Sequence, residues 1–157
     1  MSNGKQEMTS MERVLTTLSH KEPDRVPLFL LVTMHGAKEL GLSIKEYFSK
    51  AEYVVEGQKR MLKKYRHDCL YPFFYGPVEI EAFGGEVVWY EDGPPNSSQP
   101  FIQHHDEILS LTPPKIEETT CLHKVLEATT ALNTWSQGTT PIIGVAISPF
   151  SLPVMQM

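Results

Sequence analysis

The sequence predicts an α/β fold in which helices alternate with parallel strands. Three segments carry the strand pattern, each a short apolar run that ends at a turn or at a strand-breaking residue: 26–32, 68–71 and 140–148. The stretches between them carry apolar residues at helical spacing. This alternation joins parallel strands by right-handed crossovers. Because it halts in mid-pattern, we expect the front part of a larger α/β domain.

A helix is predicted near the start of the chain. Thr9 and Glu12 form a capping box, with a hydroxyl at the first position and a carboxylate three residues later. Apolar residues then follow at helical spacing to about His20, and Pro23 ends the helix. Residues 1–7 are expected to be a disordered N-terminus, followed by one domain over 8–157.

Two further capping boxes follow in succession, at 43–46 and 49–52. They predict a short helix followed by a longer one. Apolar side chains keep a single face through both helices as far as Tyr65, and lysines occupy the opposite face. This lysine face is most simply a solvated surface.

The region between the second and third strands contains an excursion from the strand–helix pattern. A short helix is expected between Pro77 and Gly84, which suit a helix start and stop. Residues 86–90 alternate like a hairpin strand, and 101–102 is the predicted return strand. A longer helix then covers 119–137.

Composition argues against several classes of function. A net charge of −5 and an isoelectric point near 5.7 disfavour a general nucleic-acid or anionic-membrane binder. The longest nearly apolar run, 26–34, falls far short of the roughly 20 residues that span a bilayer. Residues 1–7 lack a signal-peptide core, so we expect a cytoplasmic protein with Cys69 and Cys121 as reduced thiols.

Several short motifs, taken in order, resemble the uroporphyrinogen decarboxylase-like superfamily. They are MTSMERVL at 8–15, KEPDRVP at 21–27, AKELG at 37–41, EY at 46–47, DCLYPF at 68–73, EIEAFG at 79–84 and SPFSL at 148–152. The resemblance is greatest to the methylcobamide:coenzyme M methyltransferase branch and its corrinoid-dependent relatives. Each motif alone is weakly specific, whereas the ordered set is strong.

The resemblance implies a fold. The family folds as a (β/α)₈ barrel of roughly twice this length. This chain would be its N-terminal portion, with about three of the eight parallel strands, an N-terminal helix and a β-hairpin excursion.

The resemblance also implies a chemistry. The family's methyltransferases bind a thiol as thiolate on zinc, and the thiolate takes a methyl group from a methylated corrinoid. A corrinoid protein as partner and a small thiol as substrate follow from this. The family's zinc ligands, a His-x-Cys pair and a later Cys, lie in the C-terminal half and match no residue here. Zinc would therefore be a cofactor of the full-length parent, with no metal ligand in this chain.

The decarboxylase branch is an alternative. It uses no metal, a catalytic aspartate after the second strand, and arginines after the first strand that hold a polycarboxylated tetrapyrrole. Tyr75 aligns with that aspartate, and 33–37 contains no arginine. A neutral phenol cannot stabilise charge on a pyrrole nitrogen as a carboxylate does, and nothing replaces the bidentate arginines. These departures disfavour decarboxylation.

A third hypothesis belongs to a different class of function. Three parallel strands would leave apolar edges and faces exposed, which calls for a partner. The chain would then be a non-catalytic half-barrel module that pairs with itself or with a separate C-terminal polypeptide.

Four candidate site residues follow the C-terminal ends of the predicted strands, where barrels of this kind carry their active face. They are His35, Tyr75, Glu79 and Ser148. Tyr75 could donate a hydrogen bond to a substrate or a corrinoid tail, or it could be an amphipathic core tyrosine. Glu79 either faces the pocket or lies in a solvated first helical turn, where carboxylates are favoured. His35 is either a ligand or substrate contact, or a loop histidine bonded to the backbone.

Overall fold

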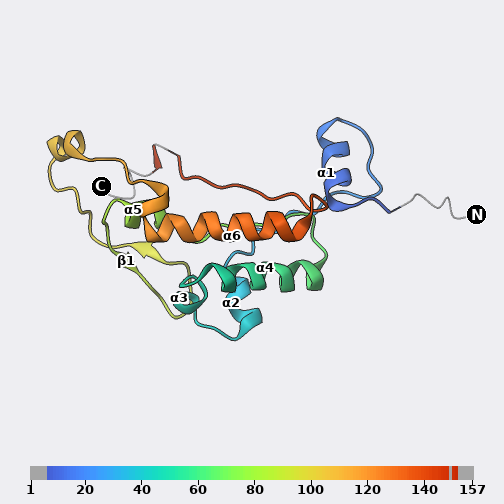
Figure 1. Cartoon of the computed structure of the whole chain (residues 1–157), viewed down its shortest axis with the longest axis horizontal. Coiled ribbons are helices and arrows are strands. Elements are labelled where there is room, and N and C mark those ends of the chain that lie inside the picture. Colours follow the sequence, from blue (N-terminus) through green and yellow to red (C-terminus); the bar gives the residue numbers. More distant parts are fainter. Residues whose placement is uncertain (1–6, 149, 152–157) are drawn as a thin grey trace, which may run out of the picture.

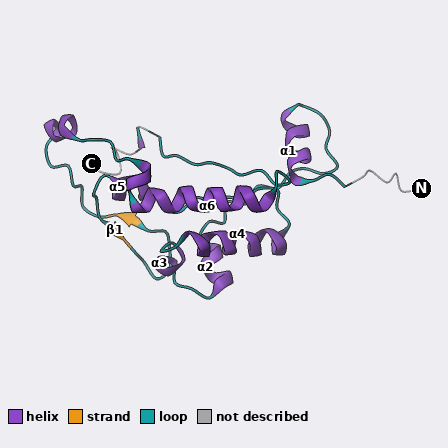
Figure 2. Ribbon diagram, in the orientation of Figure 1, coloured by secondary structure: helices purple, strands orange, loops and turns teal. Residues whose placement is uncertain are grey.

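The computed structural model describes residues 7–148, 150 and 151. The expected disorder of residues 1–7 therefore lies, except for Glu7, outside the described residues, and the motif at 148–152 lies partly outside them. Figure 2 shows that helices dominate and that strand is confined to one short hairpin. No helix among these residues has the length and apolar character needed to cross a membrane.

Two long helices, α4 (Ala51–Tyr65) and α6 (Thr120–Ser136), form the centre of the molecule. They lie side by side and run in the same direction (Figure 1), as crossover helices between parallel strands do. The first helix, α1 (Ser10–Leu18), stands near the end of α6. There the Met11 N–H donates to the carbonyl of Thr139 at 2.9 Å.

The capping box of α1 is confirmed. The Thr9 hydroxyl accepts from the N–H of Glu12 at 3.2 Å, and the Glu12 carboxylate accepts from the N–H of Thr9 at 2.8 Å. The expected apolar face of this helix is only partly buried, however. Leu15 and Leu18 are 54% and 71% exposed, whereas Arg13 is 3% exposed. An ion-pair network buries the arginine in place of the leucines, as shown below.

Of the next two predicted capping boxes, the first supplies an N-cap and the second does not. Ser43 caps the short helix α3 (Ile44–Tyr47) by accepting from the N–H of Glu46 at 3.2 Å. The box predicted at 49–52 is wrong, because the N-cap of α4 is Lys50 and makes no side-chain cap. The Ser49 hydroxyl instead donates to the carbonyl of Glu46 at 2.7 Å. Ser49, which lies between the two helices, therefore bonds to the end of α3 and does not cap the start of α4.

The three predicted parallel strands lie side by side but do not form a regular sheet. Leu70 N donates to Pro141 O at 2.8 Å and Ile143 N donates to Leu70 O at 2.9 Å, which makes one isolated parallel bridge between Leu70 and Ile142. On the other side, Asp68 N donates to Leu28 O at 2.7 Å. The predicted segments therefore lie next to one another as expected, but their assignment as regular strands is not confirmed. Among the described residues, each outer segment has a backbone neighbour on one side only, so little holds it in a ladder.

The predicted hairpin exists with a different return strand. Strand β1 (Val87–Val88) pairs antiparallel with β2 (Asn96–Ser97), and the expected return strand at 101–102 is wrong. The two strands pair through backbone hydrogen bonds, so the return strand can consist of two polar residues with low strand propensity, Asn96 and Ser97. Propensity therefore pointed to the later apolar pair.

Several helices have boundaries that local sequence marks well, and one was missed. The short helix α5 (Val78–Ala82) and the long α6 appear where predicted. Helix α2 (His35–Leu40) has no counterpart among the predicted elements, and Gly41 ends it in the left-handed conformation at φ 69°. The remaining helical turns are the 3₁₀ segments η1 (His105–Ser110) and η2 (Ile116–Glu118).

The core lies between α4, α6 and the chain that follows the second predicted strand. Aromatic side chains dominate it, with Phe48 against both Phe74 and Tyr75 at ring-centroid distances of 5.7 and 5.5 Å. Helix α2 approaches α4 closely through glycines. A Cβ placed on Gly57 would lie 2.6 Å from the Tyr47 hydroxyl oxygen. The two cysteines are buried and free, as reduced thiols would be.

Candidate functional site

A cavity of about 410 Å³ lies beyond the C-terminal end of segment 68–71. Its walls come from 72–74, α5, η2, α6 and 144–145. These lining residues are apolar or small apart from Glu79 and Thr129. The cavity therefore combines an apolar surface with one carboxylate, the usual make-up of a small-molecule site.

Glu79 is held in this cavity by the first turn of α5 and by the third predicted strand. Its Oε1 accepts a hydrogen bond from the N–H of Ile147 at 3.2 Å. Its Oε2 is buried and has no hydrogen-bond partner among the described residues. A buried carboxylate oxygen without a partner costs free energy, and a donor or cation from a ligand would offset that cost. Of the two alternatives for Glu79, the structure favours the pocket-facing one.

Tyr75 lies in the core beside the cavity. Its side chain is 2% exposed and its ring stands edge-on to Trp89 at a centroid distance of 5.0 Å. The hydroxyl donates to Glu81 Oε2 at 2.5 Å. Burial, and then the neighbouring Glu81 carboxylate, raise the pKa of Tyr75 well above its usual value. Tyr75 is therefore a neutral phenol whose hydroxyl already makes a hydrogen bond within the protein, to Glu81. This fits the alternative of a core tyrosine.

His35 occupies a different place, at the start of α2. Its Nε2 lies 2.8 Å from the Tyr65 hydroxyl and 3.2 Å from Glu39 Oε1. Lys64 donates to the same Glu39 oxygen at 2.6 Å. His35 lines a second cavity of about 580 Å³, which shares no lining residue with the Glu79 cavity. The histidine is thus bonded to side chains, and it does not join Glu79 in one site.

Ser148 is not among the residues that line the Glu79 cavity. It follows Ile147, the residue whose N–H binds Glu79, but its own side chain is exposed. Its hydroxyl oxygen accepts from the N–H of Ser151 at 3.1 Å, which makes a local turn. The fold thus places Ser148 next in sequence to the residue that binds Glu79, and it keeps His35 at a separate cavity. The roles of all four residues stay predictions.

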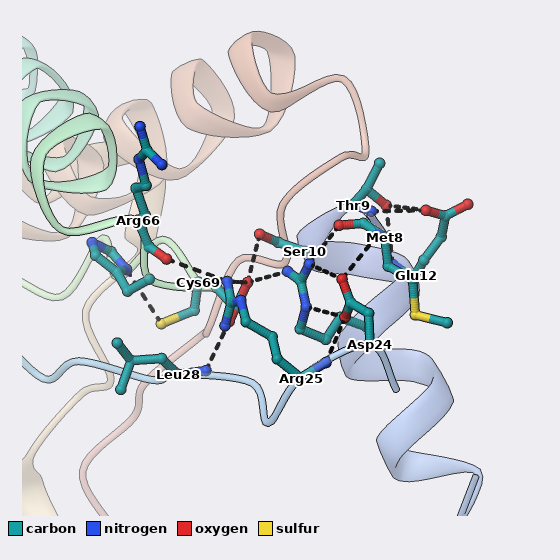
Figure 3. A network of polar contacts seen from close by, with 12 residues as sticks. Met8, Thr9, Ser10, Glu12, Asp24, Arg25, Leu28, Arg66 and Cys69 are labelled. Atoms are coloured by element: carbon teal, nitrogen blue, oxygen red, sulfur yellow. Dashed lines mark hydrogen bonds and ion pairs between the residues drawn. The ribbon is translucent and has the colours of Figure 1, made fainter. Parts of the chain in front are cut away.

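Sequence reasoning missed a cluster of polar and charged residues at the opposite end of the second predicted strand (Figure 3). We call it the entrance network, and its residues are Ser10, Arg13, Asp24, Arg25 and Asp68. The Arg13 Nη1 donates to Asp68 Oδ1 at 2.6 Å, and its Nε and Nη2 donate to Asp24 at 2.6 and 2.7 Å. One guanidinium therefore holds two carboxylates from separate segments, which is the bidentate geometry that suits arginine.

Asp68 is the centre of the entrance network. Besides Arg13, it accepts hydrogen bonds from Arg25, from the Ser10 hydroxyl at 2.9 Å and from the N–H of Leu28 at 2.8 Å. Its exposed fraction is 0%. Burial acts to raise the pKa of Asp68, but hydrogen bonds from Arg25, Leu28, Ser10 and Arg13 outweigh it and hold this pKa below its ordinary value.

The signal for this network was present in the sequence. Its charged residues lie inside the motifs at 8–15, 21–27 and 68–73 that carry the family resemblance. Part of what these motifs specify is therefore the entrance network, which is structural and lies away from the candidate site. A charged residue next to an apolar strand, as Asp68 is, is the local sign of a buried ion pair.

The described residues do not fit a metal site of their own. No group of three or more histidine, cysteine, aspartate or glutamate side chains within them is placed to hold a metal ion. Glu79 offers one free carboxylate oxygen, which is too few ligands for zinc.

Comparison with known proteins identifies relatives of this fold. The family model described as uroporphyrinogen decarboxylase (URO-D) matches residues 9–157. The solved structure of a methyltransferase from Methanosarcina mazei superposes with a TM-score of 0.76 at 19% sequence identity. The match covers 93% of this chain and 44% of that one, so the chain spans less than half the length of this relative. No curated protein matches the chain.

Proposed function

The chain belongs to the uroporphyrinogen decarboxylase (URO-D) family, and on this premise we propose that it is the N-terminal portion of a corrinoid-linked methyltransferase. The whole domain would transfer a methyl group from a corrinoid protein to a small thiol. Zinc bound by residues outside this chain would supply the thiolate. The fold shared with a methyltransferase from Methanosarcina mazei is consistent with this choice.

One observation carries the choice between the two branches of the family. The position that aligns with the decarboxylase aspartate holds Tyr75, which is buried, neutral and already bonded to Glu81. It has no negative charge to stabilise a protonated pyrrole, and 33–37 supplies no arginine for substrate carboxylates. Decarboxylation of a tetrapyrrole lacks its essential groups here, whereas methyl transfer does not require them.

The residues of this chain would shape the reaction space. The apolar walls of the Glu79 cavity would limit the access of water, and a thiolate that is less solvated by water is the better nucleophile. Glu79 Oε2 would accept a hydrogen bond or a positive charge from the thiol substrate or the corrinoid tail. Ile147 fixes the orientation of that carboxylate.

The test uses this chain joined to the remaining part of the family domain, with its His-x-Cys and Cys residues intact. We expect the joined protein to bind zinc and to demethylate methylcobalamin when a thiol is present, followed by the change in the cobalamin absorption spectrum. Release of CO₂ from uroporphyrinogen would instead support the decarboxylase. A joined protein that neither binds zinc nor demethylates methylcobalamin would contradict the proposal.

The half-barrel module is a second candidate, and a specific observation favours it. Apolar side chains on both outer segments of the incomplete sheet are exposed, among them Val26, Leu31 and Val145. Such a surface calls for a partner whether or not the chain takes part in catalysis. In this case a complex would form without any methyl transfer.

A further inference from the structure

We propose that the surface where α4 and α6 lie together, near the C-terminal ends of both helices, binds an acidic helical segment of a partner protein. We call this surface the basic seam and define it by Lys59, Lys63, Arg66 and Trp135. The proposal is independent of methyl transfer, because the cavity at the basic seam shares no lining residue with the Glu79 cavity.

The distribution of charge is the first argument. The chain carries a net charge of −5, yet five of its 14 lysines and arginines fall within 59–66, a stretch without aspartate or glutamate. Two of these cations are already paired, Arg60 with Glu56 at 2.8 Å and Lys64 with Glu39 at 2.6 Å. The other three, which are the cations of the basic seam, have no carboxylate partner among the described residues. Like charges gathered on one surface create a local potential that attracts a negative partner.

The three unpaired cations are arranged in a line. Lys59 and Lys63 are about one helical turn apart on α4, and Arg66 follows as the residue that caps the helix. Positions i, i+4 and i+7 share one helix face, and at about 1.5 Å per residue the line extends over roughly 10 Å. The Arg66 guanidinium points away from the entrance network, to which its carbonyl is bonded (Figure 3). A line of cations matches a polypeptide with carboxylates at the same spacing, whereas a single phosphate needs donors that converge on one point.

An exposed tryptophan adds an apolar contact to the basic seam. Trp135, near the end of α6, is 45% exposed, and the ammonium nitrogen of Lys59 lies 5.3 Å from the centroid of its ring. The ring borders a cavity of about 480 Å³ whose lining also includes Leu62 and Lys63 of α4. Tryptophan and arginine are the residues that most often dominate the binding energy of protein interfaces. The indole would cover an apolar side chain of the partner while the cations bind its carboxylates.

The charge of the whole chain and the spacing of the cations favour a partner helix over other anions. A nucleic acid or an anionic membrane presents a wide field of negative charge, which the chain's net charge of −5 opposes. A second copy of the chain offers carboxylates in 86–118, which contains seven acidic residues and one lysine. These carboxylates lie on the hairpin, loops and 3₁₀ turns without regular spacing. A helix with carboxylates at every third or fourth residue matches the line of cations along its length.

The test uses the full chain and a designed acidic peptide. The peptide has about 20 residues, enough for a helix in isolation, with glutamates at i, i+4 and i+7 and leucines beside them. A control peptide carries glutamine in place of each glutamate. We expect the acidic peptide to change the fluorescence of Trp135, a change that Trp135→Phe removes, and to bind more weakly as salt is added. The control peptide should not bind.

Three variants locate the contact. Lys63→Glu reverses a charge in the basic seam and should weaken binding of the acidic peptide by about tenfold or more. Lys63→Arg keeps the charge and should bind as the native chain does. Lys45→Glu, at an exposed position on α3 outside the basic seam, changes the net charge by the same amount as Lys63→Glu and is the matched control. Both positions are exposed, so the helical circular-dichroism signal of all three variants should match that of the native chain.

Four outcomes would overturn the proposal. The first is that the acidic peptide does not bind even at low salt. The second is an equal effect of Lys63→Glu and Lys45→Glu, which would show a response to net charge alone. The third is tighter binding of phosphatidylserine vesicles or of a single-stranded oligonucleotide than of the peptide, which would make the basic seam a general polyanion surface. The fourth is salt-sensitive self-association that Lys63→Glu abolishes, which would make a second copy the occupant.

Discussion

Arg13 and Asp68 are separated by 55 positions in the sequence, yet Arg13 Nη1 lies 2.6 Å from Asp68 Oδ1. Both side chains are almost completely buried, with 3% and 0% exposed. Arg13 also binds Asp24, so it connects α1 and the loop that contains Asp24 to the start of segment 68–71. The entrance network lies at the opposite end of segment 68–71 from the Glu79 cavity.

Removing the arginine should destabilise the chain strongly. Arg13→Met leaves two carboxylates without their shared partner, and loss of one member of a buried pair costs about 3–5 kcal/mol. Arg60→Met is the matched control, because Arg60 forms an exposed pair with Glu56 at 2.8 Å on α4, and such pairs contribute about 0–1 kcal/mol. Urea unfolding measures both. Equal midpoints for the two variants would show that the entrance network does not stabilise the fold.

The same network predicts loss of stability in acid. Hydrogen bonds from Arg13 hold the pKa of Asp24 below its ordinary 3.8, and Asp68 is lowered as well. A lowered pKa in the folded state means that the unfolded chain binds protons first. The stabilisation is therefore complete above about pH 4 and is lost as pH falls through the folded-state values. Urea midpoints between pH 5 and pH 2 should decline in the native chain and decline less in Asp24→Asn.

His67 predicts a second loss of stability, nearer neutrality. Its side chain is 2% exposed and its Nε2 has no partner among the described residues. Burial lowers the pKa of His67 below its ordinary 6.5, so the unfolded chain gains the proton first and stability falls as pH drops below about 6.5. His67→Asn should flatten the dependence of the urea midpoint on pH between 7 and 5. His123→Asn, at a histidine on the surface of α6, should leave that slope unchanged.

Gly57 should tolerate no side chain. Alanine is ordinarily the better residue in a helix by about 1 kcal/mol. At this position its Cβ would lie 2.6 Å from the Tyr47 hydroxyl oxygen and 3.0 Å from the Cα of Gly36, and overpacking of that kind costs about 1–3 kcal/mol. Gly57→Ala should therefore lower the thermal midpoint. Gly144→Ala, with nothing within 4 Å of the added Cβ, is the control and should change it little.

Glu79 should matter for ligand binding more than for folding. In the protein joined to the rest of its domain, Glu79→Gln removes the charge and should lower kcat/KM by about 10–100-fold, the loss expected for a charged hydrogen bond to a ligand. Glu52→Gln, at an exposed position in the first turn of α4, is the control. An unchanged kcat/KM for Glu79→Gln would show that its free oxygen does not meet the substrate.

Local sequence predicted the elements whose causes are local. Thr9 and Glu12 satisfy each other within one turn, so the start of α1 could be placed from the sequence. Ser49 has the same kind of pattern and fails, because the end of α3 takes its hydroxyl first. The return strand at 96–97 has no apolar pattern, since it is selected by backbone pairing with β1. Helix capping is decided within a few neighbouring residues, whereas strand pairing depends on where the partner strand lies in the fold.

The sequence by itself determined the family, the order of the long helices and of the three extended segments, and the residues near the ends of those segments. The tertiary structure alone decided which of them meet: Arg13 with Asp68 at the entrance, Glu79 with Ile147 at the cavity, and His35 with Tyr65 at a separate place. The reason is physical. Helix propensity and capping act within one or two turns, whereas burial of a charge or of an apolar edge depends on segments that are distant in sequence and, for the outer segments, on a partner.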